Sequence, residues 1–303
     1  MKEADFNNLR RIKIKERDSK VNIKEFGRPF EGDMGQFLSS LPSILSAKDL
    51  KEFIEQIIER KKSGGKLLLN SGAHPVKLGL NPIMIDLMTA GIIDGLSINS
   101  AFAIHDFEIA FFGRTSEDVA KYLRNGLFGM AEETGKKMNE FILKGYNEKT
   151  GLGESFGKEF TKGKYAEYSV LASAYKFGIP VFVHPCIGTD IINQHPEASG
   201  AAIGETGMRD FKRLVWFIGK MEKGVVLHIG SAVVVPEVFL KAVNLARNLY
   251  GDIDLISGVI DMNLQYRELE NVVSRPVKKG YFFVCREEIL FPLIASILKV
   301  RLK

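Results

Sequence analysis

Short apolar runs alternate along the chain with longer segments in which apolar residues recur at helical spacing. The predicted strands are 66–70, 92–99, 179–184, 225–231, 253–261 and 280–285. The predicted helices are 46–62, 81–91, 116–123, 129–145, 167–178, 208–224, 235–251 and 287–299. Several helices have an early proline or serine cap and a final glycine. This alternation predicts an α/β fold with a mostly parallel sheet of about six strands and helices on both faces.

The beginning of the chain differs from the rest. Residues 1–45 are polar and basic, include RRIKIKERDSK, and are short of strand signals. We expect them to form an N-terminal basic arm, because such runs are usually solvated. Residues 46–303 contain no linker and no internal repeat, so they predict a single α/β domain.

Histidines follow the predicted strands. All five lie at or just after a strand end: His74, His105, His184, His195 and His228. Ligands of open parallel sheets bind outside the carboxyl ends of the strands, and neighbouring small residues would let a ligand approach the backbone. We therefore expect His74, His105, His184 and Asp190 to lie within one cleft. The residues to which we assign catalytic roles are His105, Asp106, His184 and Asp190.

Other interpretations of these residues stay open. His228 could be a core histidine in an apolar strand, and Asp106 could serve only the start of a helix. Zinc or iron would need ligands from separate strands, because no H-x-H, H-x-x-x-H or C-x-x-C spacing occurs, and we assign no metal ligand. HIGSAV lacks the spacing of a serine nucleophile elbow, and neither a Walker loop nor a G-x-G-x-x-G fingerprint is present.

Composition narrows the class of protein. The chain has 303 residues, of which 45% are hydrophobic and 26% charged, with a net charge of +5. It is long enough for a sizeable core, and its dispersed basic residues predict no nucleic-acid partner. No apolar stretch is long enough to span a membrane, and the first residues lack the apolar run of a secretory signal. Cys186 and Cys285 are too few for a disulfide framework, so we expect a reduced, cytoplasmic protein without a membrane partner.

Five segments together resemble deoxyhypusine synthase and its bacterial relatives. From about residue 40 onward they are SGAHPVKLGLNPIMIDLM, AIHDFEIAFFGRTSEDVA, IPVFVHPCIGTD, GVVLHIGSAVVVP and EEILFPLIASIL. The resemblance implies a Rossmann-like sheet in a homotetramer, active sites at a dimer interface, and NAD along the strand ends. The positions expected to bind the cofactor are Ser71, Gly72, Ala73, His74, Asn99, Ser100, Ala101, Thr189, Gly230, Ser231 and Ala232.

The chain departs from this family where the family carries its lysine. In the family, NAD takes a hydride from spermidine, and the imine passes to that lysine and then to a lysine of a translation initiation factor. Here the matching position falls near Val273, and the nearest lysines, Lys278 and Lys279, are expected to enter the last strand. A family histidine is matched by about Pro236. Without the lysine, no enzyme imine can form at that position.

These features predict a deoxyhypusine synthase-like enzyme that uses NAD to oxidise a polyamine or related small amine, with aminoalkyl transfer as an optional second step. It is not expected to be a true deoxyhypusine synthase. A histidine of near-neutral pKa would take the amine proton, and acidic residues would hold the cation. The expected partners are a small-molecule amine and further copies of the chain in a tetramer. Two alternatives stay open: a nucleotide-binding sensor or scaffold without the family chemistry, and a metal-dependent hydrolase.

Overall fold

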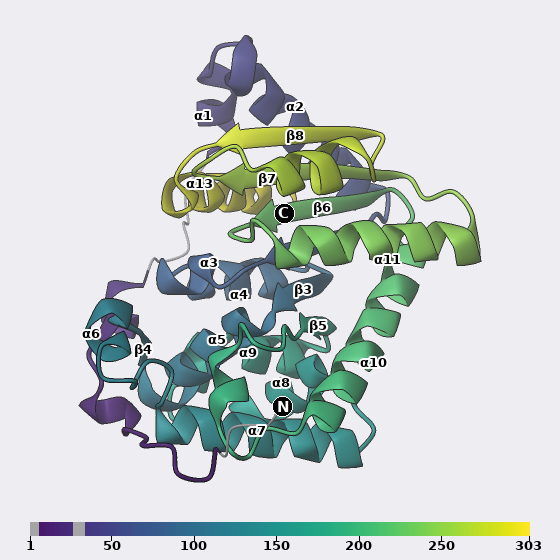
Figure 1. Ribbon diagram of the computed structural model, residues 1–303. Helices are drawn as coiled ribbons and strands as arrows, with labels where there is room; N and C mark the ends of the chain where they lie inside the picture. The colour runs from purple at the N-terminus through teal and green to yellow at the C-terminus, as the bar shows by residue number, and fades with distance from the viewer. Residues whose placement is uncertain (1–5, 27–33) are drawn as a thin grey trace.

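A parallel sheet forms the centre of the computed structural model, which describes residues 6–26 and 34–303. Its six strands lie in the order β5-β3-β2-β6-β7-β8, and every neighbouring pair is parallel. Their bounds are β2 Leu67–Ser71, β3 Gly95–Asn99, β5 Val181–His184, β6 Gly224–Ile229, β7 Leu255–Asp261 and β8 Lys279–Val284. The predicted α/β fold with about six parallel strands is confirmed (Figure 1).

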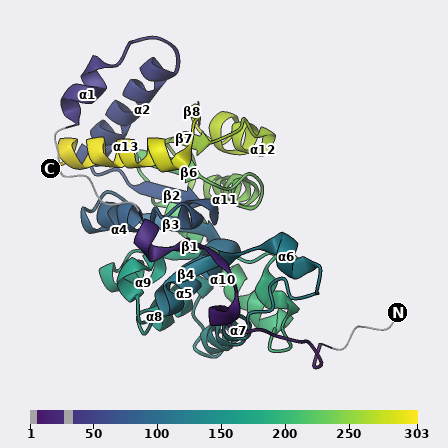
Figure 2. The ribbon, with the colours of Figure 1, turned by 90° about the vertical axis from the view of Figure 1, so that its left-hand side faces the viewer.

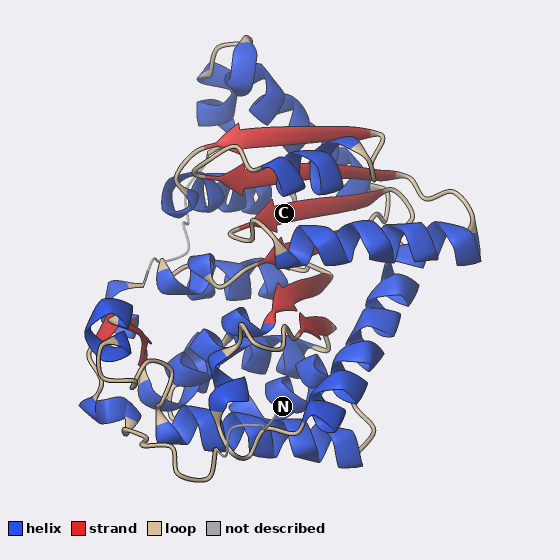
Figure 3. Ribbon diagram, viewed as in Figure 1, coloured by secondary structure: helices blue, strands red, loops and turns tan. Residues whose placement is uncertain are grey.

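Helices connect the strands and make up most of the remaining chain (Figure 3). The longer helices are α2 Leu45–Lys62, α4 Asn81–Thr89, α5 Ser100–Phe112, α7 Glu132–Asn147, α8 Leu152–Phe160, α9 Val170–Phe177, α10 Gly200–Gly219, α11 Val234–Tyr250 and α13 Glu287–Arg301. The short ones are α1 Gly35–Ser40, α3 His74–Lys77, α6 Val119–Leu123 and α12 Tyr266–Glu268. Single turns of other helical types are η1 Ile14–Glu16, η2 Ile23–Glu25, η3 Ala166–Tyr168, η4 Ile191–Gln194 and η5 Leu269–Ser274. Within the described ranges, no helix combines the length and apolar character needed to cross a bilayer.

Alternate residues of the central strands face two separate cores. In β6, Val225 and Leu227 belong to the core that includes α2, α4 and α13, whereas Val226 belongs to the core formed with α10 and α11. Figure 2 shows α2, α4 and α13 on one side of the sheet and α11 and α12 on the other. Because helices cover both faces, these strands are apolar at nearly every position, which explains why they were predictable as continuous apolar runs.

The strand order places a topological switch point between β2 and β6. Counted along the chain, the strands of this sheet run 3-2-1-4-5-6, the order found in dinucleotide-binding Rossmann sheets. The chain moves outward from β2 through β3 to β5, and then returns to lay β6 against β2. Ligands of such sheets bind beyond the carboxyl ends at this reversal. If this sheet binds a nucleotide, the expected position is at the loops after β2 and β6.

The N-terminal segment contains ordered structure that sequence analysis did not predict. β1 (Ser19–Asn22) pairs antiparallel with β4 (Arg114–Glu117), in a small sheet separate from the main one. Arg17, just before β1, is only 3% exposed. A four-residue strand of mixed polarity gives no alternation to detect, which is why we expected a solvated arm here. Residues 27–33 of the expected arm lie outside the described residues.

Two predicted helices need correction. The segment 116–123 divides into β4 and α6, and the cap of α6 is Asp118, whose side chain accepts from Lys121 N at 3.2 Å. Ser116, which we expected to be the cap, belongs to the strand. The segment 208–224 contains the end of a longer helix, α10, which begins at Gly200 with Ser199 as its cap.

Candidate functional site

A cavity of about 220 Å³ lies at the carboxyl edge of the sheet, beyond β3 and β5. The lining residues that matter below are Arg17, Lys77, His105, Glu108, Glu117 and Asp190. They come from the N-terminal segment, α3, α5, β4 and the loop after β5. Because pockets for drug-sized ligands measure roughly 300–1,000 Å³, the space suits a small metabolite rather than a large ligand.

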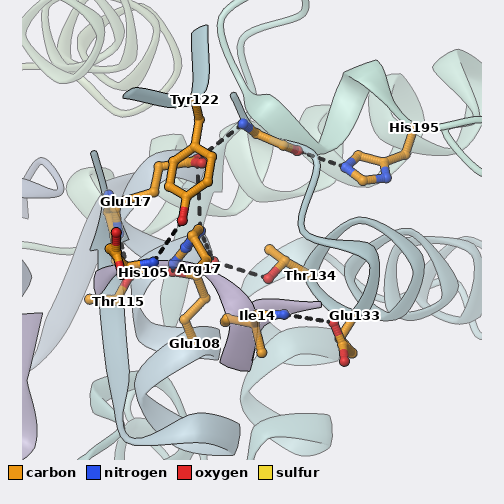
Figure 4. Close-up of polar contacts among 12 residues, drawn as sticks. Ile14, Arg17, His105, Glu108, Thr115, Glu117, Tyr122, Glu133, Thr134 and His195 are labelled. Carbon is orange, nitrogen blue, oxygen red and sulfur yellow. Dashed lines mark hydrogen bonds and ion pairs between the residues drawn. The ribbon is translucent and has the colours of Figure 1, made fainter. Parts of the chain in front are cut away.

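A chain of hydrogen bonds sets the tautomer of His105. Its Nδ1 lies 2.7 Å from Thr115 Oγ1, and Thr115 donates its single hydroxyl hydrogen to Glu108 (Figure 4). Because that hydrogen is already used, Thr115 must accept from His105, so Nδ1 carries the ring proton and Nε2 offers a lone pair. Among the described residues Nε2 has no hydrogen-bond partner, and the ring lines the cavity. The arrangement supplies an oriented acceptor for a ligand N–H.

Burial lowers the pKa of His105 to about 4. The Glu108 carboxylate acts in the opposite direction, while the charges of Lys77 and Arg17 lower this pKa further. The ring is therefore neutral at pH 7, and it does not have the near-neutral pKa that we expected of a proton-accepting histidine. A neutral ring can accept a hydrogen bond from a cationic amine without repelling it.

A buried ion pair fastens the N-terminal segment to α5 at the wall of this cavity. Arg17 Nη1 and Nη2 donate to the Glu108 carboxylate at 2.9 and 2.7 Å, and each side chain is 1% exposed. Thr134 of α7 donates to the same carboxylate at 3.0 Å. Glu117 lies 3.7 Å from Arg17 and accepts from Gly129 N. Figure 4 shows how these groups converge from segments far apart in the sequence.

Asp190 supplies a buried carboxylate to the same cavity. Its side chain lines the cavity, although the residue is only 7% exposed, and its Oδ2 accepts from Cys186 N at 2.8 Å. Burial raises the pKa of Asp190 above its usual range, and hydrogen bonds offset this effect only in part. Asp190 forms no ion pair with any described residue. The carboxylate is therefore available to a cationic ligand.

The backbone at the cavity wall is strained. Ser116 of β4 lines the cavity and has a φ of 67°, in the left-handed region. A residue other than glycine pays roughly 1–3 kcal/mol for such a conformation, and it persists where the surroundings enforce it. Residues of this kind gather at ligand sites, which agrees with a functional role for the cavity.

Asp106, which we assigned a catalytic role, faces away from the cavity. It is completely buried and accepts hydrogen bonds from the side chains of Asn81 and Ser169 and from the backbone N–H groups of Val170 and Leu171. Burial raises its pKa to about 6. These contacts fix the N-terminus of α9 against α5, so the proposed site does not include Asp106.

Two of the expected histidines also lie outside the cavity. His184 ends β5 with its Nε2 2.9 Å from Ser97 Oγ, and burial lowers its pKa to about 3. His74 Nδ1 lies 3.1 Å from Glu287 Oε1 at the start of α13. Of the four residues expected in one cleft, only His105 and Asp190 line the cavity.

The residues expected to hold NAD gather at the carboxyl ends of four adjacent strands. They are Ser71, Gly72, Ala73 and His74 after β2, Asn99, Ser100 and Ala101 after β3, Thr189 after β5, and Gly230, Ser231 and Ala232 after β6. Gly72 N donates to Ile229 O at 3.0 Å, so the loops after β2 and β6 touch at the switch point. The side chain of Asn99 caps α5 by accepting from Phe102 N at 3.0 Å.

The close approach at the switch point makes Gly72 sensitive to substitution. A Cβ at Gly72 would lie 1.9 Å from the carbonyl oxygen of Gly230, so the backbone of one loop would have to move. We expect Gly72→Ala to lower the free energy of unfolding, measured with urea, by about 1–3 kcal/mol. Gly204→Ala is the control, because a Cβ there meets nothing within 4 Å and alanine favours the helix. Equal stability of the two variants would contradict this account.

The region matching the family's lysine lies away from the cavity. Val273 packs against the core on the α11 side of the sheet. Lys279 begins β8 and pairs with Glu52, and Lys278 lies 3.8 Å from Asp254. Strands advance by roughly 3.3 Å per residue, so Lys279 starts roughly 16 Å from the carboxyl end of β8. Neither lysine can take the place of the family's lysine at the strand ends.

Sequence analysis missed several residues of the cavity, namely Arg17, Lys77, Glu108 and Glu117. One signal was available, because His105 and Glu108 are three residues apart and so share a face of α5. The position of Arg17 could not be inferred, because its partner is 91 residues away in the sequence. Within the described residues, no group of three histidine, cysteine or acidic side chains could hold a metal ion.

Comparisons with known proteins give a shared fold and one short sequence match. A scan against protein-family models finds no match. Ornithine cyclodeaminase of Methanothermobacter thermautotrophicus is 34% identical over 80 residues, which are 26% of this chain and 19% of that protein. The match thus covers about a fifth of the length of that relative. It leaves the family of this chain open.

Three solved structures illustrate the structural likeness. Unliganded AgrE has a TM-score of 0.54 at 14% identity and covers 86% of this chain and 33% of its own. ArgZ, an arginine dihydrolase from the ornithine-ammonia cycle in cyanobacteria, has a TM-score of 0.51 at 16% identity with the same coverage. A "putative deoxyhypusine synthase" from Entamoeba histolytica has a TM-score of 0.52 at 13% identity and covers 89% and 96%. This chain spans about a third of AgrE and ArgZ, and identities this low show the fold alone.

Proposed function

We propose that this protein is an NAD-dependent enzyme that oxidises a small amine in the cavity beyond β3 and β5. The observation that carries the proposal is the neutral His105 Nε2 together with the buried Asp190 carboxylate, at the carboxyl edge of a Rossmann-ordered sheet. The sequence resemblance to deoxyhypusine synthase supports an amine substrate and NAD. Ornithine cyclodeaminase and arginine dihydrolase, the names of two similar proteins, also point to substrates that carry amines.

The residues at the switch point fit a dinucleotide in two respects. Small residues follow β2 and β6, and the sheet reverses its direction of growth between these strands. Asn70, the next-to-last residue of β2, is fully buried, and its Nδ2 and Oδ1 have no hydrogen-bond partner among the described residues. A buried amide without partners is costly, so a ligand or ordered water is expected to satisfy it. The loops after β2 and β6 would hold NAD, although they lack the G-x-G-x-x-G fingerprint.

Each of these cavity residues has a separate role in the proposed amine oxidation. When bound, NAD supplies an acceptor for the hydride that leaves the carbon next to the amine. His105 Nε2 accepts a hydrogen bond from the amine and orients it. Because the ring is neutral, it does not repel the positively charged amine. The Asp190 carboxylate takes the amine proton, which frees the nitrogen lone pair, and burial makes this carboxylate a stronger base than an exposed one. Thr115 and Glu108 keep the histidine in the required tautomer.

We also propose that the protein is a homo-oligomer, as the family resemblance implies. The apolar segments FPLIASILKV and FEIAFFG are candidates for burial between subunits, but several of their side chains are already buried within the chain. Phe291 and Ile294 of α13 and Phe107 of α5 are completely buried in the core of their own chain. These three side chains are not available to a second subunit, and the oligomeric state stays a prediction.

A direct assay tests the proposed reaction. Purified protein is mixed with NAD and a panel of diamines, polyamines and basic amino acids, and the formation of NADH is followed by absorbance. We expect NADH to form with at least one amine, and titration to show saturable NAD binding without substrate. Absence of NAD binding would contradict the proposal at its first step. NAD binding without turnover of any amine would favour a nucleotide-binding sensor instead.

A further inference from the structure

The cavity contains five charged side chains, and three of them form ion pairs with one another. Arg17 is held by Glu108 through two hydrogen bonds and faces Glu117 at 3.7 Å. This leaves Lys77 and Asp190, neither of which forms an ion pair with a described residue. Lys77 is an exposed residue of α3, whereas Asp190 is a buried residue of the loop after β5. The cavity therefore offers one available cation and one available anion.

The two available charges line the same cavity and come from segments that follow different strands. Lys77 follows β2 and Asp190 follows β5, and these strands flank β3 in the sheet. A lysine side chain is long and flexible, so the ammonium group of Lys77 can adjust its position within the cavity to meet a ligand. His105, on the helix that follows β3, lines the same cavity.

We propose that the substrate is a zwitterionic amino acid, whose carboxylate binds Lys77 and whose amino group binds Asp190 and His105. This inference rests on the proposed function and names its substrate class. A polyamine carries positive charge only, so Asp190 would be its one available charged partner and Lys77 would repel it. An amino acid satisfies both groups with charge-assisted hydrogen bonds, which are stronger than those between neutral groups.

The test compares ligands that differ only in the carboxylate. L-Ornithine is paired with putrescine and L-lysine with cadaverine, and binding is measured by calorimetry at saturating NADH, which prevents turnover. We expect each amino acid to bind at least tenfold more tightly than its diamine, as one charged hydrogen bond supplies roughly a tenfold to hundredfold gain. In Lys77→Met the preference should disappear. Lys176→Met, which removes an exposed lysine outside the cavity, should keep it.

The possible outcomes separate this inference from the proposed function. Diamines that bind as tightly as the amino acids would overturn the inference, and so would a preference that survives in Lys77→Met. If such diamines also form NADH with NAD, the proposed function stands while the amino-acid substrate is rejected. Binding of neither class of ligand likewise overturns the inference, and a separate NAD titration shows whether the proposed function falls with it.

Discussion

Replacing Arg17 by methionine is expected to lower the free energy of unfolding by about 3–5 kcal/mol. The substitution leaves the Glu108 carboxylate buried at 1% exposure without its cation, and it removes the cation that faces Glu117. Thr134 and Thr115 still donate to Glu108, but two neutral hydroxyls cannot replace a bidentate guanidinium. Urea unfolding followed by circular dichroism measures the change.

Two further variants establish that the loss comes from the unpaired charge. The double variant Arg17→Met with Glu108→Met should recover much of the stability, because it removes both members of the buried pair. Lys121→Met removes a solvent-exposed ion pair with Asp18 in the same region, and it should leave the unfolding midpoint unchanged. A similar midpoint for all three variants would show that the buried pair does not hold the N-terminal segment in place.

Replacing Asp190 by asparagine is expected to reduce kcat for amine oxidation by roughly 10²–10⁴-fold. Asparagine keeps the shape and can still accept from Cys186 N, but it cannot take a proton or balance the charge of the amine. Steady-state rates of NADH formation measure the loss. NAD binding should fall much less than kcat, because most of the expected cofactor positions follow β2, β3 and β6, and only Thr189 adjoins Asp190.

The pH dependence gives this prediction a second readout. Because burial raises the pKa of Asp190, kcat/KM should increase with pH through a value above that of an ordinary aspartate, and Asp190→Asn should lose this increase. His105 should add no titration near pH 6.5, since burial holds its pKa at about 4. Glu222→Gln, a change at an exposed acid, should retain the wild-type profile. A profile that is the same in the Asp190 variant would assign the proton to another group.

The main sheet could be predicted from the sequence because its strands are buried on both faces. β2 reads LLLNS and β6 reads GVVLHI, so each gives a continuous apolar signal bounded by turn residues. The small sheet of β1 and β4 gave no such signal, since both strands are four residues long and mixed in polarity. Their structure depends on pairing across almost the whole first third of the chain, which local patterns do not report.

The site was predicted only to the level of the sheet edge. The strand ends indicated the carboxyl edge of the sheet, and His105 and Asp190 line one cavity there. The direction of a side chain near a strand end depends on its position in the following helix or loop. Asp106 is one residue from His105, but its side chain points to α9. His184 lies two residues after Phe182 in β5, so both side chains are on the face of the sheet that α10 covers. A difference of one position in the sequence can therefore decide whether a side chain lines the cavity.

The ion pair between Arg17 and Glu108 also sets an order of events during synthesis. Glu108 follows Arg17 by 91 residues, so at about 5–20 residues per second the arginine waits roughly 5–18 s before its partner exists. During that interval the basic segment is exposed on the ribosome and cannot dock. The cavity can be completed only after the loop carrying Asp190 has also emerged. The N-terminal segment is thus made early but docks late, and a chain released before residue 108 would leave Arg17 without its buried partner.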